Sequence, residues 1–342
     1  MLLSVDVGKG TTDIVLFEGN VLLKAIVPSS TTLLARAIEK TEENIVVSGY
    51  TMGGGPLASA IKNHLLKYKV FMTRNAALSL SDNVGKIESW GVEIIDEGDV
   101  TKRRGKRIFL QDLDMEFLRR LLEDTGFSFH DIGGCGLALQ DHGFSLSSNR
   151  QNRFAIYRRI LMKKKFMLPR LFFKKIPSSL TRARAAFAQI SFTHKIFMDS
   201  SYAALLGIYY ACGNCLAVNI GNGHTIAALL RKGEILGLFE HHTHLLTPGN
   251  LEMFLRMLSS GTLKNEDIFS SGGHGAFLRI SQDLPIFVAG PGRRLMEKTS
   301  LSFEYAYPFG DVMIPGNLAL TEIMKKLRWD VSPPRKDRFK NG

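Results

Sequence analysis

The stretch of sequence that decides the fold is Val5–Leu16, which reads VDVGKGTTDIVL. It aligns without a gap on Val218–Leu229, which reads VNIGNGHTIAAL. Each copy has an apolar strand, a polar residue, a glycine-rich turn and a second apolar strand, which is the pattern of a β-hairpin. A third strand-like stretch follows each copy, at residues 21–27 and 234–240. Two copies of a three-stranded meander, each followed by helical patterns, predict two related domains of the α/β class.

The two glycine tips predict a site for phosphate. A glycine has no Cβ, so its backbone can adopt positive φ and its N–H group can approach an anion closely. A lone tip of this kind is weak evidence, because many hairpins need glycine for the turn itself. The pair predicts two cradles that face each other, and their residues are Gly8, Lys9, Gly10, Thr11, Thr12, Gly221, Asn222, Gly223 and Thr225. Asp6 precedes the first turn and is placed to hold Mg²⁺ through water, since this ion keeps most of its hydration shell.

Residues 6–13 (DVGKGTTD) resemble the phosphate motif of the actin, sugar-kinase and heat-shock-chaperone ATPase superfamily. The resemblance implies two RNase H-like (actin-like ATPase) domains with a central nucleotide cleft that closes on ATP and Mg²⁺. Residues 286–295 (IFVAGPGRRL) resemble the superfamily's adenosine motif and assign Gly290 and Gly292 to the nucleotide. Residues 200–207 (SSYAALLG) are similar to the connecting helix at which the two domains hinge.

A narrower resemblance involves residues 49–56, 140–143, 240–243 and 272–275. Together they resemble a family of archaeal actin-like ATPases that is labelled pyruvate formate-lyase-activating-protein-like. That label implies radical chemistry on an iron–sulfur cluster, which needs three closely spaced cysteines. The chain has Cys212 and Cys215 close together and only a distant Cys135. We therefore reject that activity and interpret the close pair as buried thiols around a Gly-Asn turn.

Three carboxylates are the catalytic candidates, namely Asp6, Asp13 and Asp199. Each of the last two has a structural alternative, because Asp13 can cap its turn and Asp199 can cap a helix that begins near residue 200. The second hairpin departs from the superfamily pattern. Asn219 stands where a carboxylate is usual, and His224 displaces the threonine by one place.

The histidines near the second hairpin form a further candidate site. His242 and His244 share a face at the strand period of two, and with His224 and His274 they are expected near the cleft. Neutral imidazole binds metals and also serves as a general base. A transition metal held by His242, His244 and His274, contact of His242 and His244 with substrate, and structural hydrogen bonding all stay open.

A glycine loop at Gly53, Gly54 and Gly55 precedes a helical pattern at residues 57–69. The N-terminus of a helix after such a loop is a ready anion site, which predicts contact with a phosphoryl acceptor or a substrate carboxylate. Simple turn geometry is the alternative.

The positive charge of the chain belongs to one segment. The whole chain has 44 Lys and Arg against 32 Asp and Glu, a net charge of +12, yet residues 143–197 contain no acid. Part of this segment, at 150–184, is predicted to be helical. It is either an arm with a solvated basic face or a docking surface for an acidic partner protein or another polyanion. Nucleic acid is a weaker candidate, because the sequence has no RNA-recognition or zinc-finger signature.

The expected organisation is a first domain at 1–194 that includes the basic segment, a second domain at 195–329 and a disordered basic tail at 330–342. The absence of an apolar leader or of any run of about 18 apolar residues predicts a cytoplasmic protein with no transmembrane segment. The predicted strands lie at 2–7, 12–18, 21–27, 92–96, 135–140, 214–220, 225–231, 234–240 and 286–289. The predicted helices lie at 57–69, 112–125, 249–260, 291–298 and 316–327.

The leading functional hypothesis is an ATPase or phosphotransferase of the actin-like type that binds ATP. It would use Mg²⁺ to hydrolyse ATP or to transfer its phosphoryl group. One alternative is a non-catalytic scaffold or sensor that depends on nucleotide. The other is a metal-dependent enzyme that uses the histidine cluster.

Overall fold

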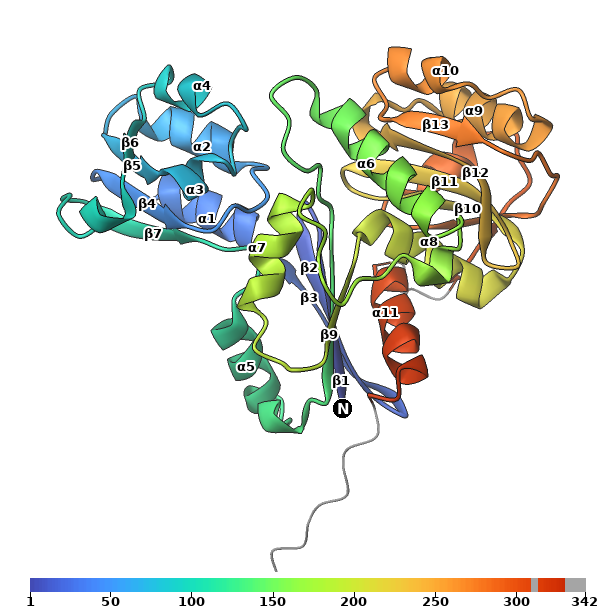
Figure 1. Ribbon diagram of the computed structural model, residues 1–342, viewed down its shortest axis with the longest axis horizontal. Helices are drawn as coiled ribbons and strands as arrows, with labels where there is room; N and C mark the ends of the chain where they lie inside the picture. The colour runs from blue at the N-terminus through green and yellow to red at the C-terminus, as the bar shows by residue number, and fades with distance from the viewer. Residues whose placement is uncertain (309–312, 330–342) are drawn as a thin grey trace, which may run out of the picture.

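A computed structural model describes residues 1–308 and 313–329, and the tail predicted at 330–342 lies outside them. The strands in the described residues form three sheets, which lie in three lobes of the molecule (Figure 1). The strands are β1 Leu2–Val7, β2 Thr11–Glu18, β3 Asn20–Pro28, β4 Ile45–Gly49, β5 Val70–Thr73, β6 Glu93–Ile95, β7 Lys106–Leu110, β8 Gly134–Leu139, β9 Lys195–Met198, β10 Cys215–Ile220, β11 His224–Arg231, β12 Glu234–His242, β13 Gly275–Leu278, β14 Ile286–Ala289 and β15 Glu304–Tyr305. The α-helices are α1 Ser30–Glu39, α2 Leu57–His64, α3 Arg74–Ala77, α4 Val84–Glu88, α5 Met115–Asp124, α6 Asn149–Lys163, α7 Thr181–Gln189, α8 Ser200–Cys212, α9 Pro248–Ser260, α10 Asn265–Ser270 and α11 Pro315–Lys326.

The first sheet has the strand order β3-β2-β1-β8-β9. The meander β1–β2–β3 is antiparallel, whereas β8 and β9 run parallel to β1. Every residue of β8 is buried, as expected for a central parallel strand that is covered on both faces. Figure 1 shows α5 and α7 on one side of this sheet and α11 on the other. The core of the molecule therefore includes apolar residues from both of its faces.

The second sheet repeats the order of the first as β12-β11-β10-β14-β15, with β13 added at the outer edge. The β10–β11–β12 meander is again antiparallel, and β14 and β15 are parallel to β10. Apolar residues of α9 pack in its core.

The gapless alignment of the two hairpins is confirmed in atomic detail. Gly8 N–H donates to the carbonyl of Thr11 at 2.8 Å, and Gly221 N–H donates to the carbonyl of His224 at 2.9 Å. Each meander also has one irregularity of register, after Leu16 in the first and after Leu229 in the second. Those two leucines are aligned residues, so the repeat in sequence is a repeat of structure.

The third sheet was not predicted as a unit, and of its strands only β6 was expected, at residues 92–96. Its order is β6-β5-β4-β7, all its pairs are parallel, and it has its own core with residues of α1 and α2. In Figure 1 it forms a separate lobe beside the first sheet. This lobe lies between β3 and β8 in the chain, so it is an insertion in the first half.

The strands and helices that were predicted are present with small shifts, but two helices differ. The helix predicted at 57–69 ends at His64, because the carbonyl of Lys69 already accepts from Ile45 N–H at the start of β4. The helix predicted at 291–298 is a 3₁₀ helix at Arg293–Lys298. The strand β9 follows residue 194, where the boundary between the domains was expected, and it is the fifth strand of the first sheet.

Two equivalent helices join the halves. The helix α8 follows the last strand of the first sheet, α11 follows the last strand of the second, and the two pack against each other. They approach closely at Gly207, where a Cβ atom would lie 2.2 Å from the carbonyl oxygen of Pro315. No helix in the described part of the chain is long and apolar enough to cross a membrane.

We expect Gly207→Ala to lower the free energy of unfolding by about 1–3 kcal/mol, because the added methyl group forces two packed helices apart. The control is Gly249→Ala in α9, where a Cβ would meet no atom within 4 Å. Chemical denaturation followed by circular dichroism measures both variants. Equal stability of the two variants would contradict this description of the helix crossing.

Candidate functional site

Both glycine tips line one small polar cavity. Its volume is about 110 Å³, and it lies at the ends of β1 and β10 nearest the tips. The predicted site residues that line it are Asp6, Lys9, Thr11, Asp13, Gly221, Asn222, Gly223 and Gly290. His224, which was expected near the cleft with the other histidines, also lines it. Sequence reasoning assigned no site role to the remaining lining residues, which are Gln140, Ser200, Ser201, Ala204, Asn219, Pro291, Met313, Pro315 and Gly316.

The two tips face each other across this cavity. A Cβ atom at Gly223 would lie 3.5 Å from Cδ of Lys9, and one at Gly10 would lie 4.0 Å from Nδ2 of Asn222. The Gly290 turn meets the second hairpin, since a Cβ at Gly290 would lie 2.8 Å from Oδ1 of Asn219. Gly290 has φ of +94°, which only glycine adopts readily. Three segments far apart in the sequence therefore meet at one place.

Asp6 and Asp13 form a pair of acids across the first hairpin. They are direct partners in the β1–β2 register. Ser200 Oγ donates to Oδ1 of Asp6 at 2.5 Å. Burial raises the pKa of Asp6 to about 6, with Ser200 opposing and Asp199 adding to the rise. Burial and the charge of Asp6 raise the pKa of Asp13 to about 7. Holding two negative charges this close together costs folding free energy, and a bound cation would offset that cost.

We expect this pair to produce a specific pH dependence of stability. The folded protein holds the Asp13 proton more tightly than the unfolded chain does, where the pKa is near 3.8. Its contribution to stability is therefore complete below about pH 4 and is lost as the pH rises through about 7. In EDTA, the free energy of unfolding of the wild type should fall more steeply between pH 5 and 8 than that of Asp13→Asn. Parallel curves in urea denaturation would contradict the raised pKa.

Two helix N-termini also reach the cavity. Ser200 and Ser201 begin α8, and Pro315 and Gly316 begin α11. A Cβ at Gly316 would lie 2.8 Å from Oδ2 of Asp6, so the first turn of α11 comes directly against that carboxylate. The first turns of helices carry unpaired N–H groups and partial positive charge.

Several predicted site residues do not line this cavity. Thr12 lies on the opposite face of β2 and lines a different hollow. Thr225 is fully buried, and its hydroxyl lies 3.1 Å from that of Thr243, which donates to the carbonyl of Gly221. The side chains of Thr12 and Thr225 therefore point away from the cavity and contribute to the packing of the two hairpins. Gly8 and Gly10 belong to the first tip and Gly292 to the Gly290 turn, but they are not lining residues.

The glycine loop before α2 is explained by close packing. A Cβ at Gly53 would lie 2.7 Å from Arg182, one at Gly54 would lie 2.2 Å from the carbonyl of Ser79, and Gly55 has φ of +32°. Arg182 makes a two-pronged ion pair with Asp112, with distances of 2.8 and 2.7 Å. This loop is apart from the residues that line the hairpin cavity, so its substrate role stays a prediction.

A buried arginine joins the two sheets next to the cavity. Arg153 of α6 is 0% exposed and binds both oxygens of Asp199 at 2.7 and 2.9 Å. Its Nε also donates to both oxygens of Glu240 at 3.0 Å, and Nη1 donates to the carbonyl of Asp141. Despite burial, which opposes ionisation, Arg153 and the neighbouring histidines hold the pKa of Glu240 well below its usual range.

These contacts give Asp199 a structural role. Besides Arg153, its carboxylate accepts from Ser201 N–H at 3.1 Å as the N-cap of α8. The structural alternative for Asp199 therefore agrees with the geometry, and the catalytic assignment does not. Sequence reasoning missed Arg153, because it counted this residue among the surface charges of a basic arm.

Four histidines gather beside the second hairpin. Nitrogens of His142, His224 and His274 lie within 4.8 Å of one another. The ring centroid of His242 lies 4.8 Å from that of His224 and 4.7 Å from that of His274. His244 contacts only His242 in this group, with centroids 5.6 Å apart.

The expectation that His242 and His244 share a strand face is wrong. The strand β12 ends at His242, and residues 243–245 form a 3₁₀ turn, so the period of two stops there. His241 is fully buried, with Nδ1 3.0 Å from the carbonyl of His242 and Nε2 3.1 Å from Ser271 Oγ, a structural arrangement. His142 was missed as a site residue, although it lies three residues after the end of β8, in the segment that reaches the cavity with Gln140.

The environment keeps most of these imidazoles uncharged at neutral pH. Burial, followed by the charge of Arg153, holds the pKa of His142 well below its usual range. Burial lowers the pKa of His274 to about 3, with Glu240 opposing. Burial and His224 lower that of His242 to about 4. A neutral imidazole has a free lone pair, which is the form that binds a metal ion.

The cysteines form no shared site. Cys215 is buried at the start of β10 and Cys212 is half-buried at the end of α8. Gly213 lies between them with φ of +75°. Burial raises the pKa of the Cys215 thiol to about 12, so it is not a reactive thiolate at neutral pH. The third thiol, Cys135, is buried within β8.

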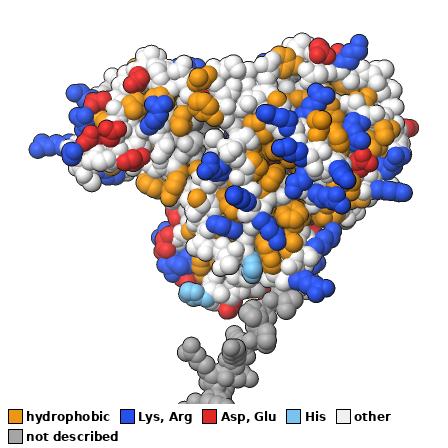
Figure 2. All heavy atoms as spheres, in the orientation of Figure 1, with side chains coloured by type: hydrophobic (Ala, Val, Ile, Leu, Met, Phe, Trp, Pro, Cys, Tyr) orange, Lys and Arg blue, Asp and Glu red, His pale blue; other side chains and the backbone are white. Residues whose placement is uncertain are grey.

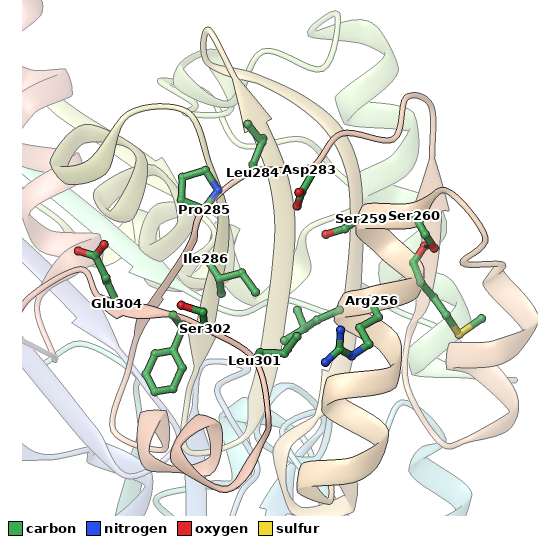
Figure 3. Close-up of a pocket in the computed structure, with 13 residues that line it drawn as sticks. Arg256, Ser259, Ser260, Asp283, Leu284, Pro285, Ile286, Leu301, Ser302 and Glu304 are labelled. Carbon is green, nitrogen blue, oxygen red and sulfur yellow. Dashed lines mark hydrogen bonds between the residues drawn. The ribbon is translucent and has the colours of Figure 1, made fainter.

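A larger hollow lies elsewhere on the second sheet. It measures about 660 Å³ and is lined by α9, the start of β14 and residues 301–304 (Figure 3). Ile286, which begins β14, contributes to it, whereas Gly290 follows the other end of that strand. None of the residues that line this hollow was predicted as a site residue, and it is separate from the hairpin cavity.

The basic segment is partly internal. Arg153 and Arg182 form the ion pairs described above, and Arg150 donates to the carbonyl of Gly273. The exposed cations of the segment are Arg158, Arg159, Lys163, Lys165, Arg170, Lys174, Lys175 and Arg184. Figure 2 shows Lys and Arg side chains among hydrophobic ones over the face on which α6 lies. Docking of an acidic partner there stays a prediction.

The fold and the cavity define an α/β protein with two repeated sheets and a polar site at the ends of their central hairpins. Residues 52–295 match the family model described as "Putative pyruvate format-lyase activating enzyme (DUF1786)". The match covers well over half of the chain, so the protein belongs to this family, as the resemblance in the sequence predicted. The activity in that description is a statement about the family and is not carried over to this chain.

No curated protein matches the chain. The solved structures similar to it include the crystal structure of ethanolamine utilization protein EutJ from Carboxydothermus hydrogenoformans. The two chains are 11% identical, the similarity covers 93% of this chain and 88% of that one, and the TM-score is 0.31. No conclusion on fold or function rests on a likeness of that degree.

Proposed function

We propose that this protein binds ATP with Mg²⁺ between two RNase H-like domains of the actin-like type, and hydrolyses it or transfers its phosphoryl group. The observation that carries the proposal is the meeting of both glycine tips, the Gly290 turn and Asp6 at one cavity. The matching strand orders of the two sheets support the assignment of both halves to one domain type.

The surroundings of the cavity favour a phosphate chain. The N-termini of α8 and α11 both reach it, and Lys9 extends from the first tip to the second. Backbone N–H groups at helix N-termini and in glycine turns bind phosphate oxygens. A single such terminus would be weak support, but here two helices, a lysine and two tips converge.

The residues present fit Mg²⁺. Oδ1 of Asp13 is buried and has no hydrogen-bond partner within residues 1–308 and 313–329. Asp6 would hold the ion through water, and Asp13 would supply the second negative charge. When bound, the ion would neutralise charge on the phosphates and orient them. Ser200 keeps the Asp6 carboxylate in a fixed orientation for that task.

The proposal requires the cleft to open for the nucleotide to enter. The cavity of about 110 Å³ is far below the roughly 300–1,000 Å³ of typical ligand pockets. We infer that the two sheets separate around the α8–α11 crossing and close again on the phosphates. Closure of this kind excludes water from the reacting groups.

Isothermal titration with ATP, in the presence and the absence of Mg²⁺, tests the proposal. We expect saturable binding of about one nucleotide per chain that weakens when Mg²⁺ is removed. No binding at millimolar nucleotide would contradict it. Binding without any release of phosphate would favour the alternative of a nucleotide-dependent scaffold, which Asn219 supports by replacing the carboxylate of the second hairpin.

A further inference from the structure

The histidine cluster contains a residue whose presence the fold does not explain. His274 is 1% exposed, and neither of its ring nitrogens has a hydrogen-bond partner among the described residues. A buried polar group without a partner costs about 1–3 kcal/mol of folding free energy. An apolar side chain would fill the same space without that cost, so His274 indicates a ligand.

The neighbours of His274 are of the kind that bind the same ligand. Nitrogens of His142 and His224 lie within 4.8 Å of one another and of His274. The three residues come from the end of β8, the tip of the second hairpin and the turn before β13. Three segments that are far apart in the sequence thus place imidazole nitrogens close together.

We propose that His142, His224 and His274 bind a first-row transition-metal ion, with zinc as the expected ion. Imidazole suits zinc, iron, copper and nickel, whereas Mg²⁺ and Ca²⁺ prefer oxygen ligands. In a tetrahedral zinc site with Zn–N bonds of about 2.0–2.1 Å, two nitrogens lie about 3.3 Å apart. Metal binding therefore needs the rings to move together by at most about 1.5 Å.

Glu240 is placed to orient one ligand in the manner of metal sites. Its Oε1 lies 3.3 Å from Nδ1 of His224, a nitrogen that forms no hydrogen bond with another described residue, so an ion on Nε2 would leave Nδ1–H to donate to this carboxylate. Such carboxylate partners fix the tautomer and the orientation of ligating histidines. Arg153 in turn holds both oxygens of Glu240. The buried network thereby acquires a role in positioning His224.

The cluster borders a further histidine and the hairpin cavity. His242 packs against both His224 and His274, so the fourth position of the ion is open to this ring or to water. His224 also lines the hairpin cavity, which places the ion in the wall of that cavity. Binding of the ion by these histidines does not depend on bound nucleotide.

The test uses full-length protein prepared without a histidine tag and stripped of metal with a chelator. We expect Zn²⁺ to bind at about one ion per chain in the absence of nucleotide. Co²⁺ in its place should give the visible absorption of a low-symmetry site with imidazole ligands. His274→Ala should weaken Zn²⁺ binding by at least about 100-fold, since even the partners that orient ligands change affinity by 10–100-fold.

His130→Ala is the matched control, because His130 is exposed and lies at residues 129–131, outside the cluster. It should bind Zn²⁺ as the wild type does. If His274→Ala does not fold, as judged by circular dichroism, His142→Ala replaces it, since this residue is only partly buried in a loop. Wild-type protein that binds neither Zn²⁺ nor Co²⁺, or equal affinity in the wild type and the ligand variant, would overturn the proposal.

Discussion

Arg153→Met should lower the free energy of unfolding by about 3–5 kcal/mol, the range for a buried ion pair that loses one partner. The guanidinium makes four contacts of 2.7–3.0 Å with the carboxylates of Asp199 and Glu240. Without it, two buried carboxylates remain with no cation between them. Methionine fills a similar volume, so the loss measures charge and not a cavity.

The matched control for Arg153→Met is Arg158→Met, on the exposed side of the same helix. A surface substitution of this kind changes stability by no more than about 0.5 kcal/mol. Urea denaturation at pH 7 compares both variants with the wild type. Similar small effects in the two variants would mean that Arg153 does not hold the sheets together.

Asp6→Asn should reduce turnover of Mg-ATP by about 100-fold or more, a typical effect of removing one group that stabilises charge at a reacting phosphate. The amide has the shape of the carboxylate, but it lacks the charge that would hold Mg²⁺ through water. Folding should be preserved, because the charged form of Asp6 is disfavoured by burial, as its raised pKa of about 6 indicates.

Asp124→Asn, on the exposed end of α5, is the control for the loss of one acid. It should hydrolyse ATP as the wild type does. Phosphate release measured at saturating Mg-ATP distinguishes the two variants. Full turnover in Asp6→Asn would remove Asp6 from its proposed role and leave the metal cluster as the more attractive reaction centre.

The sequence predicted the two meanders, because hairpins leave strong local signals, but it missed the helix α1 that follows the first of them. Glycine tips, alternating apolar residues and short connections can all be recognised within a window of about 25 residues. The inserted sheet, apart from its strand β6, was missed for the opposite reason. Its strands are short, such as Val70–Thr73, and are paired with strands distant in the chain. A short apolar run without alternation does not distinguish a buried strand from a helix.

The candidate site was predicted in part. Asp6, Lys9 and Gly223 were assigned from the tips and do line the cavity. Ser200 and Gly316 were not assigned. Each lies at the N-terminus of a helix, and only the tertiary structure places that terminus at the cavity. His142 and Arg153 were missed for a related reason. Their roles depend on contacts with residues about 45–130 positions later in the chain, and no local pattern encodes those contacts.

The most direct test of the central claim is a crystal structure of the protein with Mg²⁺ and a non-hydrolysable ATP analogue. We predict density for the phosphates between Gly8–Thr12 and Gly221–Thr225, with Asp6 on the magnesium side and Gly290 against the adenosine. Nucleotide density in the hollow beside α9, along the exposed face of α6, or nowhere in crystals soaked at millimolar analogue would contradict the account.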